Sequence, residues 1–120
     1  MIGSKHHQGI NRKLKIGIVL STNEAELAWN AFRFGIRAIE NNHTVRTFLL
    51  AHGVECEDVI DDKFNVKQMM QDYVSKGGVI LTCGSCLKIR NKEGTQLCPI
   101  STMQDMVDLT VESDRVLTFG

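Results

Sequence analysis

A chain of 120 residues with 42% hydrophobic side chains is long enough to form one domain with its own core. Its 14 basic and 14 acidic side chains cancel, which argues against general attraction to nucleic acid or an anionic membrane. No apolar run approaches the roughly 20 residues that span a bilayer, and the polar start lacks a signal-peptide core. We therefore expect a cytoplasmic protein whose four cysteines are reactive, metal-binding or buried thiols rather than a disulfide framework.

The first third of the chain has a polar start followed by one predicted strand and one predicted helix. Residues 1–13 are polar and without apolar periodicity, which predicts a flexible tail before a single domain of residues 14–120. The apolar run of residues 15–20 predicts a strand covered on both faces. Residues 25–41 place apolar side chains at three- and four-residue steps, as in an amphipathic helix. Three residues of helix-capping type precede it: Ser21, Thr22 and Asn23.

The rest of the chain continues the alternation of strand and helix. The pattern predicts strand 44–51, helix 64–74, strand 79–81, short helix 87–91, brief strand 96–100, a helix of residues 103–111 capped by Ser101 or Thr102, and strand 115–119. This order predicts an α/β fold with a mainly parallel sheet of about five strands and helices on both faces. Reactive groups in such sheets collect beyond the carboxyl ends of the strands.

Cys83 and Cys86 lie where the third strand hands over to a helix. Backbone N–H groups without partners and the positive end of a helix favour thiolate there, so we expect a lowered cysteine pKa. Four neighbours support this interpretation: Gly84 and Ser85, which add little bulk, and Lys88 and Arg90, which add positive charge. The pattern therefore predicts a reactive thiol that a partner's sulfur can approach closely.

Other interpretations of the cysteines stay open. Cys83 and Cys86 are also compatible with small core residues at a tight turn, or with a zinc site completed by Cys98 and by Cys56 or His52. The Cys-Gly-Ser-Cys spacing also looks locally like the motif of a dithiol-disulfide oxidoreductase. A non-catalytic oligomeric subunit or binding module is a third class of function.

The remaining candidates have weaker signals. Cys98 is expected to be a half-buried structural thiol before Pro99, and Cys56 an inert loop residue whose flanking Glu55 and Glu57 disfavour thiolate. His52 follows the second strand and is either an ordinary loop histidine or a group that assists proton transfer or orients a partner.

Four segments of residues 15–120 carry a family resemblance: Lys15–Leu20 (KIGIVL), Phe48–Val54 (FLLAHGV), Cys83–Lys88 (CGSCLK), and the ending Ser101–Met106 with Asp114–Gly120. In this order they resemble the DsrE/DsrF-like family, which includes sulfur-relay proteins of the DsrEFH and TusD type. The resemblance implies a three-layer α/β/α domain that assembles into trimers or hexamers. It also implies a cysteine after the third large strand that accepts sulfane sulfur as a persulfide, without any cofactor.

Cys83 matches the persulfide-carrying position of that family best. The resemblance thus implies that Cys83 takes sulfur from a donor protein and passes it to the cysteine of an acceptor protein. Relay members have a small apolar residue where this chain has Cys86. The second thiol is therefore open to several roles: resolving a persulfide, forming an intramolecular disulfide, or replacing Cys83 as the reactive sulfur.

Overall fold

Five parallel strands form one sheet in the computed structural model, which describes residues 12–120. The strands are β1 (Lys15–Leu20), β2 (Thr44–Leu49), β3 (Val79–Cys83), β4 (Ile100–Ser101) and β5 (Arg115–Phe119). Their order across the sheet is β4-β3-β2-β1-β5, and every neighbouring pair is parallel. This confirms the predicted α/β class. The flexible tail predicted for residues 1–13 falls mostly on residues 1–11, outside the described residues, and stays a prediction.

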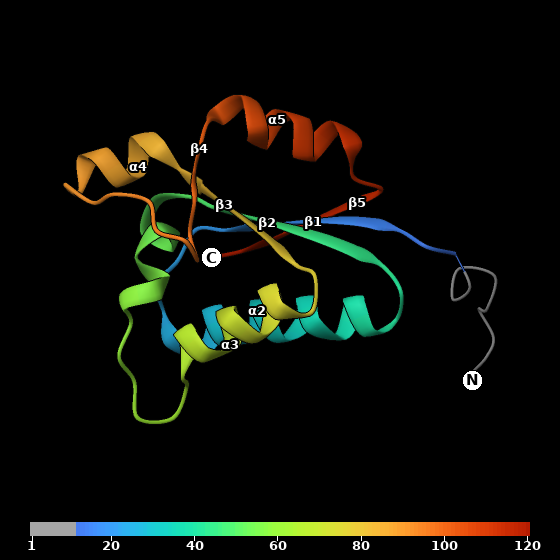
Figure 1. The fold of residues 1–120 in the computed structure, drawn as a ribbon, viewed down its shortest axis with the longest axis horizontal. Coiled ribbons are helices and arrows are strands. Elements are labelled where there is room, and N and C mark those ends of the chain that lie inside the picture. The colour runs from blue at the N-terminus through green and yellow to red at the C-terminus, as the bar shows by residue number, and fades with distance from the viewer. Residues whose placement is uncertain (1–11) are drawn as a thin grey trace.

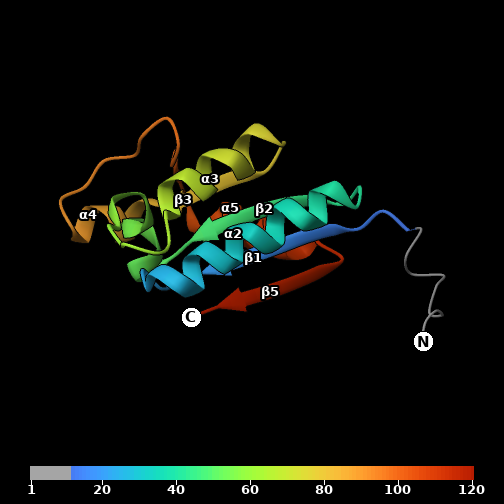
Figure 2. The ribbon, with the colours of Figure 1, turned by 90° about the horizontal axis from the view of Figure 1, so that it is seen from below.

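Helices cover both faces of this sheet. They are α2 (Ala25–Glu40), the 3₁₀ helix η1 (Ala51–Asp58), α3 (Val66–Ser75), α4 (Gly84–Ile89) and α5 (Met103–Glu112). Figure 1 shows α4 and α5 on one face and α2 and α3 on the other, and Figure 2, seen from below, shows α2 beside α3 in front of the sheet. The domain is therefore a three-layer α/β/α structure. No helix in residues 12–120 combines the length and the apolar character needed to cross a membrane.

Tyr73 of α3 ties the helical layer to the sheet. Its side chain is fully buried, and its ring meets Phe32 of α2 edge-on with the ring centroids 5.3 Å apart. Its hydroxyl accepts a hydrogen bond from Thr47 (3.0 Å) and lies within donating distance of the carbonyl oxygens of Val45 (3.1 Å) and Val79 (3.0 Å). One polar atom thus satisfies groups of both β2 and β3 inside the core.

On the other face, α5 lies close to β1 because Gly17 has no side chain. A Cβ atom at Gly17 would lie 2.4 Å from Cδ2 of the buried Leu109 and 2.8 Å from the Ser113 hydroxyl. Thr102 begins α5 with a capping box, since its hydroxyl accepts from the Asp105 N–H and the Asp105 carboxylate accepts from the Thr102 N–H. This confirms the predicted start of the last helix.

The predicted cap of α2 is wrong. Glu24 is the N-cap, and its carboxylate accepts hydrogen bonds from the Glu26 and Leu27 N–H groups, both at 3.0 Å. The three predicted capping residues have other partners: Ser21 donates to the Gly120 carbonyl, Thr22 accepts from the Glu24 N–H, and Asn23 donates to Glu55.

Three boundaries near the sheet's carboxyl edge also differ from the prediction. The second strand stops at Leu49, and a 3₁₀ helix that the sequence pattern did not reveal follows it. The fourth strand is only Ile100–Ser101. The short helix begins at Gly84 rather than Leu87, so Cys86 lies inside it. Each of these boundaries depends on contacts with segments distant in sequence.

We expect Tyr73→Phe to lower the free energy of unfolding by about 1–3 kcal/mol, because it leaves a buried hydroxyl and buried carbonyls with fewer partners. Chemical denaturation followed by circular dichroism measures this change. Ser75→Ala, which removes an exposed hydrogen bond to the Asp72 carbonyl in the same helix, is the control and should change stability by no more than about 0.5 kcal/mol. Equal stability of Tyr73→Phe and wild type would contradict the role given to this hydroxyl.

Candidate functional site

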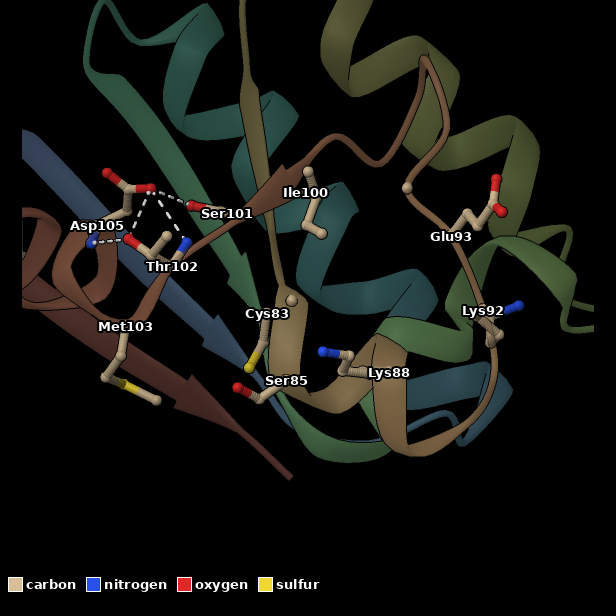
Figure 3. A pocket seen from close by; sticks show the side chains of 12 residues that line it. Cys83, Ser85, Lys88, Lys92, Glu93, Ile100, Ser101, Thr102, Met103 and Asp105 are labelled. Atoms are coloured by element: carbon tan, nitrogen blue, oxygen red, sulfur yellow. Dashed lines mark hydrogen bonds between the residues drawn. The ribbon is translucent and has the colours of Figure 1, made fainter.

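A cavity of about 690 Å³ opens at the carboxyl end of β3. It lies between α4 and the segment that runs from β4 into α5 (Figure 3). Parallel pairing sets Cys83 directly beside Ser101, so the ends of β3 and β4 meet at its base. Its lining residues are Cys83, Gly84, Ser85, Lys88, Lys92, Glu93, Gly94, Ile100, Ser101, Thr102, Met103 and Asp105. Four of the predicted site residues therefore share one cavity with residues far along the chain.

Cys83 is the last residue of β3 and the N-cap of α4. It is 3% exposed, and its contact with the outside is through the cavity. Burial raises the pKa of the Cys83 thiol, and the neighbouring Cys86 thiol raises it further, while the backbone N–H groups of Cys86 and Ser85 act in the opposite direction. The expectation of a lowered pKa is thus wrong for Cys83, because desolvation outweighs the backbone N–H groups.

Cys86 lies in the first turn of α4 and is only partly buried. Its sulfur accepts a hydrogen bond from the Ala51 N–H, with nitrogen and sulfur 3.2 Å apart. Ala51 has a φ of 53°, in the left-handed region that residues other than glycine seldom occupy. The start of η1 therefore holds a strained backbone whose N–H group meets the Cys86 sulfur. Cys86 is not among the residues that line the cavity.

The small side chains between the cysteines have a packing role as well. A Cβ atom at Gly84 would lie 3.0 Å from the Ser101 carbonyl oxygen and 3.2 Å from Cγ1 of Ile100. The absence of a side chain at Gly84 thus allows α4 to start in close contact with β4. Ser85 is exposed and lines the cavity beside Cys83, as Figure 3 shows.

The two predicted cations have different surroundings. Lys88 is exposed and lines the cavity. Arg90 points to η1, where its Nε donates to Glu55 at 2.5 Å and its Nη1 to the Cys86 carbonyl at 3.1 Å. Arg90 is the main cause of a lowered pKa of the Glu55 carboxyl. Burial is the next-largest effect and raises that pKa, and smaller contributions from Asn23 and His52 lower it. The guanidinium charge is thereby paired with a carboxylate, and Lys88 is the predicted cation that faces the cavity.

His52 belongs to the network around Glu55 rather than to the cavity. Its Nδ1 lies 3.3 Å from Glu55 Oε1 and 3.4 Å from Arg90 Nη2, and its side chain is mostly exposed. Asn23 donates to the same Glu55 oxygen at 2.7 Å. These contacts connect α4 to η1 and to the loop after β1. His52 therefore lies beside the Glu55–Arg90 pair and not in the cavity lining.

Cys56 and Cys98 are buried away from the cavity lining. Burial raises the pKa of each thiol to about 12, with added repulsion from Glu55 at Cys56 and from Glu57 at Cys98. Cys56 is a fully buried residue of η1 whose thiol donates to the Thr22 carbonyl, so the expectation of a loop position is wrong. No three histidine, cysteine or acidic side chains of residues 12–120 gather as metal ligands.

Sequence reasoning missed the opposite wall of the cavity. Ser101 is 7% exposed and donates to the Asp105 carboxylate at 2.5 Å, which lowers the pKa of that carboxyl. Lys92, on the rim, forms an ion pair with Asp58 of η1. The capping pattern at Thr102 located the start of α5, but the sequence has no signal that β4 pairs with β3. That pairing brings this wall to Cys83.

The sequence profile of the DsrE/DsrF-like family matches residues 14–119. An uncharacterized protein of Methanocaldococcus jannaschii is 31% identical over 100 residues, which cover 78% of this chain and 88% of that protein. An uncharacterized protein of Methanopyrus kandleri is 30% identical over 103 residues, covering 78% of this chain and 83% of the relative. The family match thus spans all five strands and the turn that holds Cys83 and Cys86.

We expect iodoacetamide at about pH 8 to modify the Cys83–Cys86 pair of the folded protein and to leave Cys56 and Cys98 unmodified, because alkylation requires thiolate and access to the sulfur. Peptide mass spectrometry after short exposure measures the modification at each site. The same treatment in denaturant is the control and should modify all four thiols. Equal rates at all four cysteines of the folded protein would contradict the two environments described.

Proposed function

Because the chain belongs to the DsrE/DsrF-like family, we propose that Cys83 carries sulfane sulfur as a persulfide and passes it to a partner protein. The sulfur-relay role is inferred from the family. The observation that carries its assignment to this residue is a nearly buried cysteine whose outward path is a cavity of about 690 Å³. A persulfide adds one sulfur atom beyond Sγ, and the cavity offers space for that atom next to Cys83.

The uptake step is a thiol exchange. The Cys83 thiolate attacks the outer sulfur of a donor persulfide, a new S–S bond forms at Cys83, and the donor cysteine leaves as thiolate. The backbone N–H groups of Cys86 and Ser85 and the ammonium group of Lys88 supply positive potential at this end of the cavity. Delivery reverses the roles: the thiolate of an acceptor protein attacks the outer sulfur, and Cys83 leaves. No cofactor takes part in either step.

The burial of Cys83 suits a thiol that reacts only with a partner that enters the cavity. A raised pKa lowers the thiolate fraction of Cys83 and so slows its unwanted alkylation or oxidation without preventing either. A donor that brings its own persulfide into the cavity supplies the reactive S–S bond at the place where Cys83 lies. We therefore propose donor and acceptor proteins that present a cysteine on a narrow loop, and a reducing compartment, the cytoplasm, that keeps the thiols free.

Loading of the Cys86→Ser variant tests the carrier assignment, because this variant keeps Cys83 and removes the second thiol of the pair. After incubation with cysteine persulfide and removal of the donor, intact mass spectrometry should show one added sulfur atom, which dithiothreitol removes. The Cys83→Ser variant should show none. The Cys98→Ala variant controls for loss of a buried cysteine and should load like wild type. Loading of Cys83→Ser to the level of Cys86→Ser would reject Cys83 as the carrier.

A dithiol-disulfide oxidoreductase is a second candidate, favoured by one observation. Cys83 is the N-cap of α4 and Cys86 its third residue, so the two cysteines share one helical turn, and the Cys86 thiol raises the pKa of Cys83. An oxidoreductase must reduce a model disulfide with turnover, whereas a sulfur carrier need not. If the protein is instead a non-catalytic subunit, alkylation of both thiols will leave partner binding unchanged.

We also propose that the chain forms a homo-oligomer, a trimer or hexamer, through α5 and the edge strand β5. Met103, Val107 and Val111 follow at four-residue steps on α5 and are 54%, 49% and 77% exposed. Val116 and Leu117 of β5 are 40% and 36% exposed at the end of the sheet. A run of apolar side chains on a helix and an adjoining strand edge is typical of a subunit contact. Met103 also lines the cavity, so this contact would adjoin the Cys83 site.

The double variant Val107→Glu/Val111→Glu should shift the protein toward monomer, because it places charges in the apolar contact. Size-exclusion chromatography with light scattering measures the mass in solution. Val74→Glu, on α3 in the opposite layer and 40% exposed, is the matched control and should keep the wild-type mass. An unchanged mass for the double variant would place the contact elsewhere.

A further inference from the structure

We propose that Cys86 discharges the Cys83 persulfide within the same chain, releasing its outer sulfur as hydrosulfide and closing a Cys83–Cys86 disulfide. This inference rests on the proposed function, because it needs a persulfide on Cys83. It adds a reaction to the carrier role: the domain converts stored sulfane sulfur to sulfide. Delivery to an acceptor protein and discharge as hydrosulfide then compete for the same loaded state.

The positions of the two cysteines on α4 bring their sulfurs together. Cys83 is the N-cap, and Cys86 is the third residue of the helix. In capping boxes the side chains at these two positions both turn toward the first helical turn, which makes them neighbours. The effect of the Cys86 thiol on Cys83 agrees with this proximity. Both cysteines thus belong to the first turn of the same helix.

The direction of approach selects the inner sulfur of the persulfide. Cys83 lines the cavity and Cys86 does not. Cys86 instead lies toward η1, where the Ala51 N–H donates to its sulfur. An outer sulfur that occupies the cavity is therefore on the far side of Cys83 from Cys86. Exchange at sulfur proceeds with the nucleophile and the leaving sulfur on opposite sides of the attacked atom, and this arrangement provides that geometry.

The contacts of Cys86 hold its sulfur on the side that faces η1. The strained Ala51 directs its N–H group at the Cys86 sulfur, with nitrogen and sulfur 3.2 Å apart. Arg90 donates to the Cys86 carbonyl and is itself held by Glu55 of η1. The backbone around Cys86 is thereby attached to the same 3₁₀ helix that supplies the donor. Cys86 is also more exposed than Cys83, so its proton has a route to solvent.

Atoms and electrons balance in this step. The Cys86 thiolate forms a bond to Cys83 Sγ, and the bond between Cys83 Sγ and the outer sulfur breaks. The electron pair of that bond leaves with the outer sulfur as hydrosulfide. The sulfane sulfur is reduced, and the two cysteine sulfurs are oxidised to the disulfide. A dithiol reductant must then reopen the disulfide before the chain accepts sulfur again.

The test separates loading from discharge by pH. Wild type and Cys86→Ser are loaded with cysteine persulfide at about pH 6, where an ordinary thiol attacks slowly, and the donor is removed by gel filtration. The pH is then raised to about 8.5, and free hydrosulfide and intact mass are followed with time. Removing the donor first ensures that any sulfide comes from the protein. Cys98→Ala is loaded in parallel and retains both thiols of the pair.

Wild type and Cys98→Ala should release about one equivalent of hydrosulfide per loaded chain and end two hydrogens lighter than the dithiol form, with a Cys83–Cys86 linked peptide. Cys86→Ser should keep its sulfur over the same time. Wild type that also stays loaded, or that carries the sulfur on Cys86, would overturn the discharge reaction and leave the carrier role standing. A Cys86→Ser variant that never loads would remove both.

Discussion

The parallel pairing of β3 with β4 is the constraint on which the site depends. It places Cys83 opposite Ser101 and lets α4 and α5 start from neighbouring points of one sheet edge. Gly84 makes this approach possible, since a side chain there would press on the backbone of Ser101. The cavity is the space left between two helices that diverge from adjacent strand ends. A sulfur at the end of β3 is consequently buried and yet open to one side.

The four cysteines lie in two kinds of environment. Cys56 and Cys98 lie where burial and nearby carboxylates keep them protonated, so they act as small core residues. Cys83 and Cys86 are neighbours on one helical turn but face different elements, the cavity in one case and η1 in the other. The two thiols of this turn therefore belong to one site and have different neighbours.

The 3₁₀ helix η1 is the support of this arrangement. It supplies the Ala51 N–H to Cys86, Glu55 to Arg90 and Asp58 to Lys92, so three points along residues 86–92 are held by one segment. Arg90 and Lys92 form ion pairs with the acidic residues of η1. Lys88 is the cation of α4 that lines the cavity. The groups of positive potential beside the Cys83 sulfur are therefore backbone N–H groups and one lysine, not a cluster of cations.

Local apolar periodicity and the Cys-Gly-Ser-Cys turn were enough to predict the alternation of strands and helices, a mainly parallel sheet of about five strands and the place of Cys83 after the third strand. The sequence also located the capping box of α5. Three features depend on the folded arrangement: the raised pKa of Cys83, the pairing of Arg90 with Glu55, and the side of the cavity formed by Ser101 and Asp105. Desolvation of a side chain and the pairing of strands depend on residues far apart along the chain. The apolar periodicity of a single segment therefore cannot predict either.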